Sequence, residues 1–389
     1  MTPLSFTRLV LTDFRNYTYL KMETDTRPVV LTGPNGSGKT NLLEALSFLS
    51  PGRGLRRARL GDPARNDGAG GWTVSATLQD EGLNRVLGTG LTRTGDKTLE
   101  KERRVVRIDG QNNLRATDFG DILNIGWLTP QMDRLFQEGA SGRRRFLDRL
   151  TYGFDPAHAR RTARFEKIMR ERNRLLKDGR FDPHWVASLE HQMAEQAIAI
   201  SAARLQTVDR LNRTMLAAET ESRITQDKTA FPKAHLTLTG SLEEAIASIP
   251  ALTAEDNYRE ALHNGRAIDA KAGSTTIGPH RSDLHVLHRE KDQIASLCST
   301  GEQKALLISI ILADARLQAG LHGKAPVLLL DEITAHLDQK RRIALFDEIA
   351  DLKMQAWMTG TDELLFAELG ARAQFFTVDC GTVTPAATH

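Results

Sequence analysis

A glycine-rich segment near the N-terminus places the strongest constraint on the fold of this chain. Residues 33–40 read GPNGSGKT and fit the pattern G-x-x-x-x-G-K-[ST] of a phosphate-binding loop, or P-loop. An apolar, strand-like run precedes the segment at 29–31, and an apolar helical face follows it. Glycines accept the backbone angles of such a loop, so its N–H groups can surround an anion at the N-terminus of the helix. This context favours a P-loop over a flexible glycine-rich turn.

The P-loop pattern assigns a separate task to each polar side chain. Lys39 would place a positive charge beside the β and γ phosphates, and the Thr40 hydroxyl would bind Mg²⁺. The residues predicted to bind the phosphates are Gly33, Pro34, Asn35, Gly36, Ser37, Gly38, Lys39, Thr40 and Asn41.

A second motif lies in the last quarter of the chain, where the apolar run 327–330 ends in Asp331 and Glu332. An Asp at the carboxyl end of an apolar strand is the usual Mg²⁺ partner of a P-loop. The adjacent Glu332 would face the γ-phosphate, where a carboxylate can hold and deprotonate the attacking water. Two solvated acids after a strand are the alternative, and the P-loop makes the catalytic interpretation the better one.

A third motif, Ser299-Thr300-Gly301-Glu302-Gln303-Lys304, opens a predicted helix shortly before the Asp-Glu strand. It resembles the S-x-G-[QE] signature of ABC-type ATPases, which aims a hydroxyl, a backbone N–H and a helix N-terminus at phosphate. Ser299 and Glu302 also fit a simple capping box, and both interpretations can hold together. The Leu337-Asp338 pair resembles the D-loop of the same ATPases.

The resemblance narrows when four segments are taken in order. These are Leu11 to Tyr17, Arg143 to Asp148, Gly278 to Asp283 and the signature segment 299–304. Their order resembles that of the RecF family, bacterial recombination-repair ATPases with an SMC-like head and no long coiled coil. The resemblance covers about residues 4–361.

Membership of that family would imply an ATP-dependent homodimer on DNA, at gaps or single-strand/double-strand junctions. Such a dimer would promote RecA loading with RecR and RecO, using ATP and Mg²⁺ and weak, DNA-stimulated ATP hydrolysis. The residues expected to contact nucleotide besides the P-loop are Arg15, Ser299, Gly301, Glu302 and Asp338, with the signature acting on the ATP of the other protomer.

Some positions depart from the family pattern. Cys298 stands where a Leu usually precedes the signature Ser, and Gln131 follows Pro130 where many relatives have Glu. Gln131 could act as the Q-loop glutamine that senses Mg²⁺, and it is therefore counted among the catalytic and metal-site candidates. The turn Thr359-Gly360-Thr361 stands at the place of the ABC switch histidine, which argues against fast hydrolysis. His336, in the D-loop, is expected to be structural.

DNA contact must come from local clusters, because the formal net charge is only +3. The residues 51–60, here called the basic loop, carry Arg53, Arg56, Arg57 and Arg59, with no acid before Asp62. We expect these arginines to contact duplex phosphates, the alternative being a solvated, salt-bridged surface. Glu166 and Glu171 favour that alternative for the arginine-rich helix at 156–178. Aromatic residues make up only 6% and are not interleaved with the arginines, so base stacking is not supported.

Composition and patterning complete the prediction. The two cysteines and the lack of a signal-peptide pattern fit a reducing cytoplasm, and no apolar stretch approaches a membrane span. We predict an α/β, ABC-type P-loop ATPase head with a mixed central sheet and an antiparallel β-subdomain. Lobe I would comprise 1–127 and 306–389, and lobe II, a mostly helical insertion ending in the signature, 128–305.

The periodicity gives further expectations for single segments. Uninterrupted helical patterns run from about 156 to 178 and from 183 to 227, the second as a projecting helix, a helix pair or a short coiled coil. Helices are also expected at 302–317 and 341–353, and a disordered tail after Gly381. Three other classes remain as alternatives: a transporter nucleotide-binding subunit or another SMC-like complex, a small-molecule P-loop kinase, and an OLD-type nuclease. The helical insertion argues against a transporter subunit, and the signature argues against a kinase. The lack of an added acidic domain argues against an OLD-type nuclease.

Overall fold

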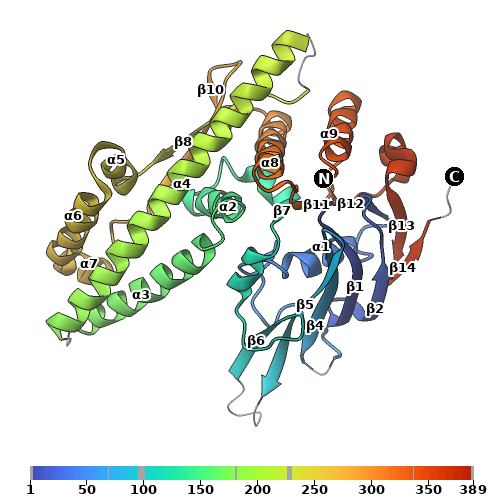
Figure 1. Ribbon diagram of the computed structural model, residues 1–389. Coiled ribbons are helices and arrows are strands. Elements are labelled where there is room, and N and C mark those ends of the chain that lie inside the picture. The colour runs from blue at the N-terminus through green and yellow to red at the C-terminus, as the bar shows by residue number, and fades with distance from the viewer. Residues whose placement is uncertain are drawn as a thin grey trace. The chain divides into compact units, whose positions relative to one another are not determined.

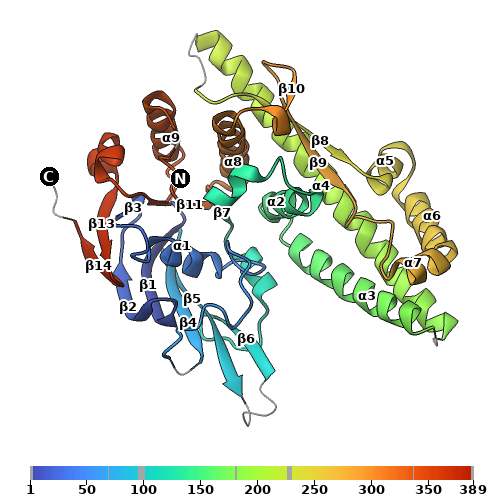
Figure 2. The same cartoon turned by 180° about the vertical axis from the view of Figure 1, so that it is seen from behind.

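The computed structural model describes residues 3–68, 70–94, 101–179, 182–225, 230–335 and 337–386. The chain divides into two compact units, traced in Figures 1 and 2. The first unit joins Met1–Asp133 to Ile311–His389, and the second is Arg134–Ile310.

The first unit contains an antiparallel sheet built from the N-terminal third of the chain. Its strands follow the order β2-β1-β4-β5-β6, and each neighbouring pair is antiparallel. In β1 the buried side chains Phe6, Leu9, Leu11 and Phe14 are interspersed with exposed or half-buried ones, and a register shift between Phe6 and Arg8 interrupts strict alternation. The strands are β1 (Ser5–Phe14), β2 (Tyr17–Glu23), β4 (Trp72–Asp80), β5 (Leu83–Thr94) and β6 (Lys101–Ile108).

A mixed sheet forms the second layer of this unit, in the order β14-β13-β3-β12-β11-β7. The pairs from β13 to β7 are parallel, and only the β13–β14 pair is antiparallel. Strands β3, β11 and β12 are buried at every position, as their apolar sequences predict, although β3 and β12 each end in a threonine. The strands are β3 (Val29–Thr32), β7 (Ile125–Leu128), β11 (Val327–Leu330), β12 (Ala356–Thr359), β13 (Gln374–Asp379) and β14 (Thr382–Pro385).

Helix α1 (Lys39–Ser47) contacts both sheets, through β4 of the antiparallel sheet and β11 and β12 of the mixed sheet. It is therefore buried on nearly all sides, and its apolar residues join one core cluster with residues of both sheets. Helix α9 (Gln339–Asp351) and the 3₁₀ segments η1 (Ala116–Asp121) and η4 (Glu363–Arg372) also belong to this unit, and the 3₁₀ segment η2 (Pro130–Arg134) ends at the first residue of the second unit.

The expectation of a disordered tail after Gly381 was wrong for residues 382–385. These residues form β14, which pairs with β13 through Phe376, Thr377, Val378 and Asp379. The turn between the two strands contains Cys380 and Gly381, both at positive φ. A hairpin of this kind is held by its partner strand, and a short polar sequence does not show that pairing.

The second unit is mostly helical. Helix α4, which begins at Pro183 and is described to Thr225, packs against α3, α6 and the strand β8. Beside the helices lies a small antiparallel sheet in the order β10-β9-β8. The elements are α2 (Ala140–Tyr152), α3 (His158–Asp178), α4 (Pro183–Thr225), β8 (Ala234–Thr239), α5 (Ser241–Ser248), α6 (Ala251–Asn264), α7 (Arg266–Ala272), β9 (Asp283–His288), β10 (Gln293–Ile294) and η3 (Ala295–Leu297).

Two segments that carried the family resemblance meet inside the second unit. Arg143 of α2 donates two hydrogen bonds to the carboxylate of Asp283, both 2.8 Å long. Arg204 of α4 binds Asp148 and also donates to the carbonyl of Pro279, at 2.6 Å. The hydrogen bonds of segments 143–148 and 278–283 therefore connect α2, α4 and β9.

Helix α8 (Thr300–His322) begins in the second unit and ends in the first. By length and composition alone it could cross a membrane, contrary to the expectation that no stretch approached a membrane span. However, 67% of its apolar window is buried inside the protein, as in a core helix.

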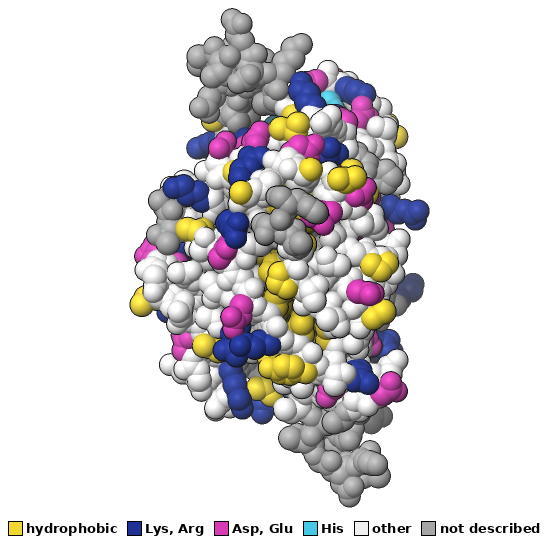
Figure 3. All heavy atoms as spheres, turned by 90° about the vertical axis from the view of Figure 1, so that its right-hand side faces the viewer, with side chains coloured by type: hydrophobic (Ala, Val, Ile, Leu, Met, Phe, Trp, Pro, Cys, Tyr) yellow, Lys and Arg dark blue, Asp and Glu magenta, His cyan; other side chains and the backbone are white. Residues whose placement is uncertain are grey.

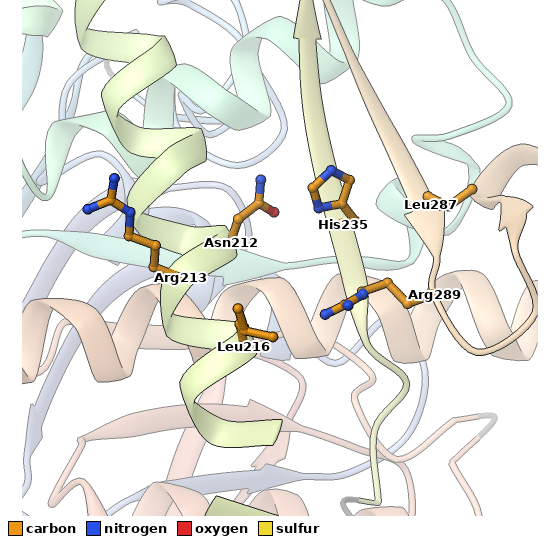
Figure 4. A pocket seen from close by; sticks show the side chains of 6 residues that line it. All are labelled: Asn212, Arg213, Leu216, His235, Leu287 and Arg289. Carbon is orange, nitrogen blue, oxygen red and sulfur yellow. The ribbon is translucent and has the colours of Figure 1, made fainter. Parts of the chain in front are cut away.

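A pocket of about 390 Å³ opens in the second unit between α4 and the small sheet. Figure 4 shows its wall, with Arg213 and Leu216 on the helix, His235 on β8, and Leu287 and Arg289 on the neighbouring strand and the turn that follows it. None of these lining residues belongs to the motifs predicted to bind nucleotide or DNA.

Candidate nucleotide site

The parallel order β3-β12-β11-β7 brings four predicted segments to one edge of the mixed sheet. The P-loop follows β3, Thr359 ends β12, Asp331 and Glu332 follow β11, and Gln131 lies in the turn after β7. In open sheets of this kind, ligands bind outside the carboxyl ends of the parallel strands. The sheet topology therefore places segments about 300 residues apart in the sequence around a single candidate site.

The backbone angles of the P-loop favour glycine at three positions, and two of these also lack space for a side chain. Gly33, Gly36 and Gly38 have φ of 142°, 81° and 117°, which residues with a Cβ rarely adopt. A Cβ at Gly33 would lie 2.1 Å from the Val378 carbonyl oxygen, and one at Gly38 would lie 2.6 Å from the Asn16 amide nitrogen. Neither position has room for a side chain.

The turn between β1 and β2 holds the P-loop backbone in place. Asn16 Nδ2 donates to the carbonyl of Ser37 at 3.1 Å, and the Tyr17 hydroxyl donates to the carbonyl of Gly38 at 3.2 Å. Burial raises the pKa of Tyr17 well above its usual value, so its hydroxyl keeps its proton and remains a donor. These contacts fix the orientation of the two peptide groups whose carbonyls belong to Ser37 and Gly38.

The ammonium group of Lys39 lies against two carbonyl groups of the P-loop. Its Nζ donates to the carbonyl oxygens of Gly33 and Pro34, at 2.7 and 2.8 Å. Partial burial lowers the pKa of Lys39, and the nearby charges of Glu332 and Asp331 oppose that effect. This placement suits the predicted contact with phosphate oxygens, which would replace the carbonyls as acceptors.

Oxygen groups suited to Mg²⁺ meet beside the P-loop. Thr40 Oγ1 donates to Asp331 Oδ1 at 2.8 Å, and the hydroxyl of Thr359 donates to the same carboxylate oxygen at 2.8 Å. The described residues contain no group of three or more His, Cys, Asp or Glu able to hold a metal alone. Mg²⁺ commonly uses one or two protein oxygens together with phosphates and water, so the oxygens of Thr40 and Asp331 are the candidate protein ligands.

Glu332 lies next to this cluster in an unusual backbone conformation. Its φ is 49°, and its N–H donates to the Thr359 hydroxyl at 2.8 Å. The side chain is exposed at the sheet edge. Thr359, named in the sequence only as a substitute for a switch histidine, thus connects Asp331 and Glu332.

Gln131 and Arg15, also predicted to contact the metal or the nucleotide, do not take part in the hydrogen bonds around Asp331 described above. Gln131 is exposed in η2, directly after β7. Arg15 was predicted to contact nucleotide, yet its guanidinium holds the buried carboxylate of Glu44 at 2.7 and 2.9 Å and the carbonyl of Asp62 at 2.8 Å. In this structure Arg15 supports the helix that follows the P-loop.

The basic loop is firmly anchored to the core, although its four arginines are exposed. Leu55 and Ala58 are buried, and the Leu55 N–H donates to Ser47 Oγ at 2.8 Å. Arg104 of β6 is bound to the carbonyls of Gly52 and Phe48. All four predicted DNA contacts, Arg53, Arg56, Arg57 and Arg59, are exposed.

An acid does reach the basic loop, although none lies within its sequence. Arg56 Nη1 donates to Glu44 of α1 at 2.8 Å. The side chain of Glu44 is fully buried, and residues 44 and 56 meet only because the loop folds back on the helix. Sequence reasoning missed Glu44; the signal was a single acid within the apolar run 42–46 of the helix next to the P-loop.

The signature segment forms a capping box at the start of α8. Ser299 N–H donates to Glu302 Oε2 at 3.0 Å, and the Glu302 N–H donates back to Ser299 Oγ at 3.4 Å. Hydrogen bonding by Lys291 and then Ser299 lowers the pKa of Glu302 to about 2. Ser299 is exposed, and Gly301 has open space around it. The capping-box interpretation is correct, and it leaves the helix N-terminus accessible.

The predicted D-loop residue Asp338 caps α9 by accepting the Arg341 N–H at 2.8 Å. Its side chain stays 59% exposed. His336 lies outside the described residues, so its predicted structural role stays a prediction.

Comparison with known proteins identifies the family. The family model described as RecF/RecN/SMC N terminal domain matches residues 5–382. Two relatives, from Rhizobium rhizogenes and Allorhizobium ampelinum, are each named DNA replication and repair protein RecF. The first is 52% identical over 97% of both chains, and the second is 53% identical over 96% of this chain and 97% of its own. The chain belongs to the RecF family.

Solved structures agree with this membership at the level of the fold. A RecF with ATPrS, described as a recombination mediator protein in the RecFOR pathway, aligns with a TM-score of 0.80, 21% identity and 99% coverage of both chains. An Smc head from Pyrococcus furiosus, bound to the C-terminal domain of ScpA, aligns with a TM-score of 0.53 and 16% identity over 98% of this chain and 96% of its own. The predicted fold class, an α/β ATPase head of the RecF and SMC type, is confirmed.

Proposed function

We propose that this RecF-family chain is an ATP-dependent DNA-binding protein of recombinational repair and replication, in which ATP joins two copies into a clamp on DNA. The observation that carries the proposal is the sheet edge where Lys39, Thr40 and Asp331 converge in a chain that belongs to this family. Binding of a duplex with a gap, measured with and without ATP, tests it: the affinity should rise with ATP.

In this proposal the P-loop N–H groups and Lys39 hold the triphosphate, while Thr40, Asp331 and Gln131 surround the Mg²⁺ site. Bound Mg²⁺ would neutralise charge on the β and γ phosphates. Asp331 is already positioned by two hydroxyl donors, so its carboxylate needs little rearrangement to face a hard cation.

Hydrolysis in this proposal depends on Glu332, which would hold and deprotonate the attacking water. Thr359 supports its backbone where a histidine would assist in faster ABC-type enzymes. A hydroxyl does not take up a proton near neutral pH as an imidazole does. We therefore expect slow hydrolysis that resets the clamp.

Glu332→Gln is expected to trap an ATP-bound dimer. The amide keeps the size of the side chain but removes the general base, a contribution of about 10²–10⁴-fold to the rate. Single-turnover hydrolysis should fall by that order, and the dimer should persist after ATP addition in gel filtration. Glu363→Gln, at a partly exposed glutamate of the same unit, is a matched control. Rapid dissociation of the Glu332→Gln dimer would contradict the assignment of Glu332.

DNA contact is proposed for the four exposed arginines of the basic loop. Figure 3 shows one face of the molecule, on which basic side chains lie beside acidic ones. With a net charge of +3, attraction to DNA must come from local groups of basic residues. The basic loop is such a group, because it brings four arginines together within seven residues.

The double variant Arg56→Ala/Arg57→Ala is expected to weaken duplex binding by about tenfold and to reduce the slope of log K against log salt by about 2. Fluorescence anisotropy at several salt concentrations measures both quantities. The control Arg170→Ala/Arg174→Ala removes two exposed arginines from α3, and it should leave the slope at the wild-type value. An unchanged slope in the Arg56/Arg57 variant would rule out phosphate contact by this loop.

The partners and location follow from the same proposal. The clamp would act at gaps or single-strand/double-strand junctions in the cytoplasm and, with RecR and RecO, promote RecA loading. The family membership supports this assignment. The test is RecA filament formation on gapped DNA, which the chain should accelerate only when RecR, RecO and ATP are present.

A further inference from the structure

A continuous set of hydrogen bonds joins the basic loop to the P-loop backbone. Arg56 Nη1 donates to Asn41 Oδ1 at 2.7 Å, and Asn41 Nδ2 donates to Asn16 Oδ1 at 2.8 Å. Asn16 Nδ2 in turn donates to the Ser37 carbonyl at 3.1 Å. Each group in this set, here called the relay, donates in the direction of the P-loop.

Glu44 holds the Arg56 end of the relay and also Arg15, the residue that precedes Asn16 in the chain. Its fully buried carboxylate accepts Nη1 of Arg56 at 2.8 Å, and it accepts two donors from Arg15, the residue next to Asn16. A buried carboxylate needs paired, hydrogen-bonded cations, so both arginines are strongly held where they are. Glu44 lies one helical turn beyond Thr40 and thus joins α1, the β1–β2 turn and the basic loop.

Arg56 can bind an anion without leaving this arrangement. Both of its hydrogen bonds to α1 use Nη1, and within the described part of the chain Nε and Nη2 have no partner. The side chain is 33% exposed. A phosphate that binds the free edge of the guanidinium would therefore hold Nη1 against Glu44 and Asn41 rather than pull it away.

We propose that Glu44 is a positioning residue that couples DNA contact at the basic loop to nucleotide binding at the P-loop, through Arg56, Asn41 and Asn16. This inference rests on the proposed function and adds its internal route. Phosphate contact at Arg56 orders the relay, and the relay orients the Ser37–Gly38 peptide whose N–H faces the nucleotide phosphates. The coupling is therefore positive, and by linkage ATP tightens DNA binding by the same factor.

The experiment measures the affinity for a non-hydrolysable ATP analogue with and without saturating duplex DNA. It uses the Ser299→Arg background, confirmed as monomeric by light scattering, so that dimer avidity does not contribute. With an intact relay, DNA should tighten nucleotide binding by about fivefold or more, the lower end of ordinary coupling. With Glu44→Gln the ratio should fall below about twofold.

Two further variants separate the relay from charge and from stability. Arg53→Gln removes a charge from the same loop but has no recorded hydrogen bond to α1 among the described residues. Arg53→Gln should weaken DNA binding, but at saturating DNA it should keep the ratio of nucleotide affinities measured with and without DNA. Arg56→Lys keeps the charge but lacks the planar fork that reaches Glu44 and Asn41, so its ratio should also fall. Because residue 56 is exposed, Arg56→Lys still tests the relay if Glu44→Gln lowers the midpoint of thermal unfolding.

The outcomes distinguish this inference from the proposed function. An unchanged ratio in both Glu44→Gln and Arg56→Lys would overturn the relay, as would a ratio of one with the relay intact. A wild-type chain that failed to bind nucleotide or DNA at all would instead contradict the proposed function.

Discussion

Lys39→Met is expected to abolish ATP binding at ordinary assay concentrations. The variant removes a positive charge whose hydrogen bonds to phosphate contribute about 1.5–3 kcal/mol each, and it leaves an apolar chain inside the loop. We expect binding to weaken by about 100-fold or more. Because the ammonium group already lies 2.7 and 2.8 Å from loop carbonyls, its removal acts at the centre of the site.

Isothermal titration with an ATP analogue and Mg²⁺ measures this effect. Lys177→Met is the matched control, because Lys177 is an exposed lysine of α3 in the second unit. The control should bind nucleotide like the wild type. Retention of wild-type affinity by Lys39→Met would show that the P-loop does not hold the triphosphate.

Ser299→Arg is expected to abolish ATP-dependent dimerisation while leaving ATP binding to the monomer intact. In the proposed clamp, Ser299 and Gly301 close over the γ-phosphate of the second copy, and a bulky side chain there would block the approach. The exposed capping-box geometry leaves room for an arginine in the monomer, so folding should be preserved. The loss of the capping hydroxyl should cost about 1 kcal/mol of stability.

Analytical ultracentrifugation with ATP tests the Ser299→Arg variant, beside Ser248→Arg at an exposed position at the end of α5. The control should dimerise with ATP. If Ser299→Arg dimerises equally well, the signature does not form part of the contact between copies.

The fold class could be predicted because its evidence is local and contiguous. The apolar runs of β3 and β11 are fully buried strands, and each carries its motif directly after its last residue. The helices predicted at 302–317 and 341–353 correspond to α8 and α9, displaced by a few residues at their ends. The functional roles of the P-loop, Asp331, Glu332 and Ser299 remain predictions, to be tested by the variants above.

Contacts between distant segments could not be predicted in the same way. Glu44 lies twelve residues before Arg56, and no periodicity shows that a loop returns to its own helix. Thr359 joins Asp331 only because β12 lies between β3 and β11 in the sheet. The pairing of β14 depends on a partner strand, so its own short polar sequence indicated a free tail.

These contacts change how the P-loop is understood. The P-loop receives support from the β1–β2 turn, from α1 and, through Arg56, from the basic loop. Half of the proposed active site is nevertheless expected to come from a second copy, because the signature has a capped but open helix N-terminus. The proposed function therefore requires ATP to link two protomers.

The most direct test of this claim is the molar mass of the wild-type chain in multi-angle light scattering, with Mg²⁺ and either ATP or ADP, repeated with gapped duplex DNA. Dimerisation by ATP predicts a protein mass of 43.1 kDa with ADP and twice that protein mass with ATP, and the ATP form should bind the DNA and add the mass of the DNA. A mass that stays at 43.1 kDa in saturating ATP, with and without DNA, would contradict it.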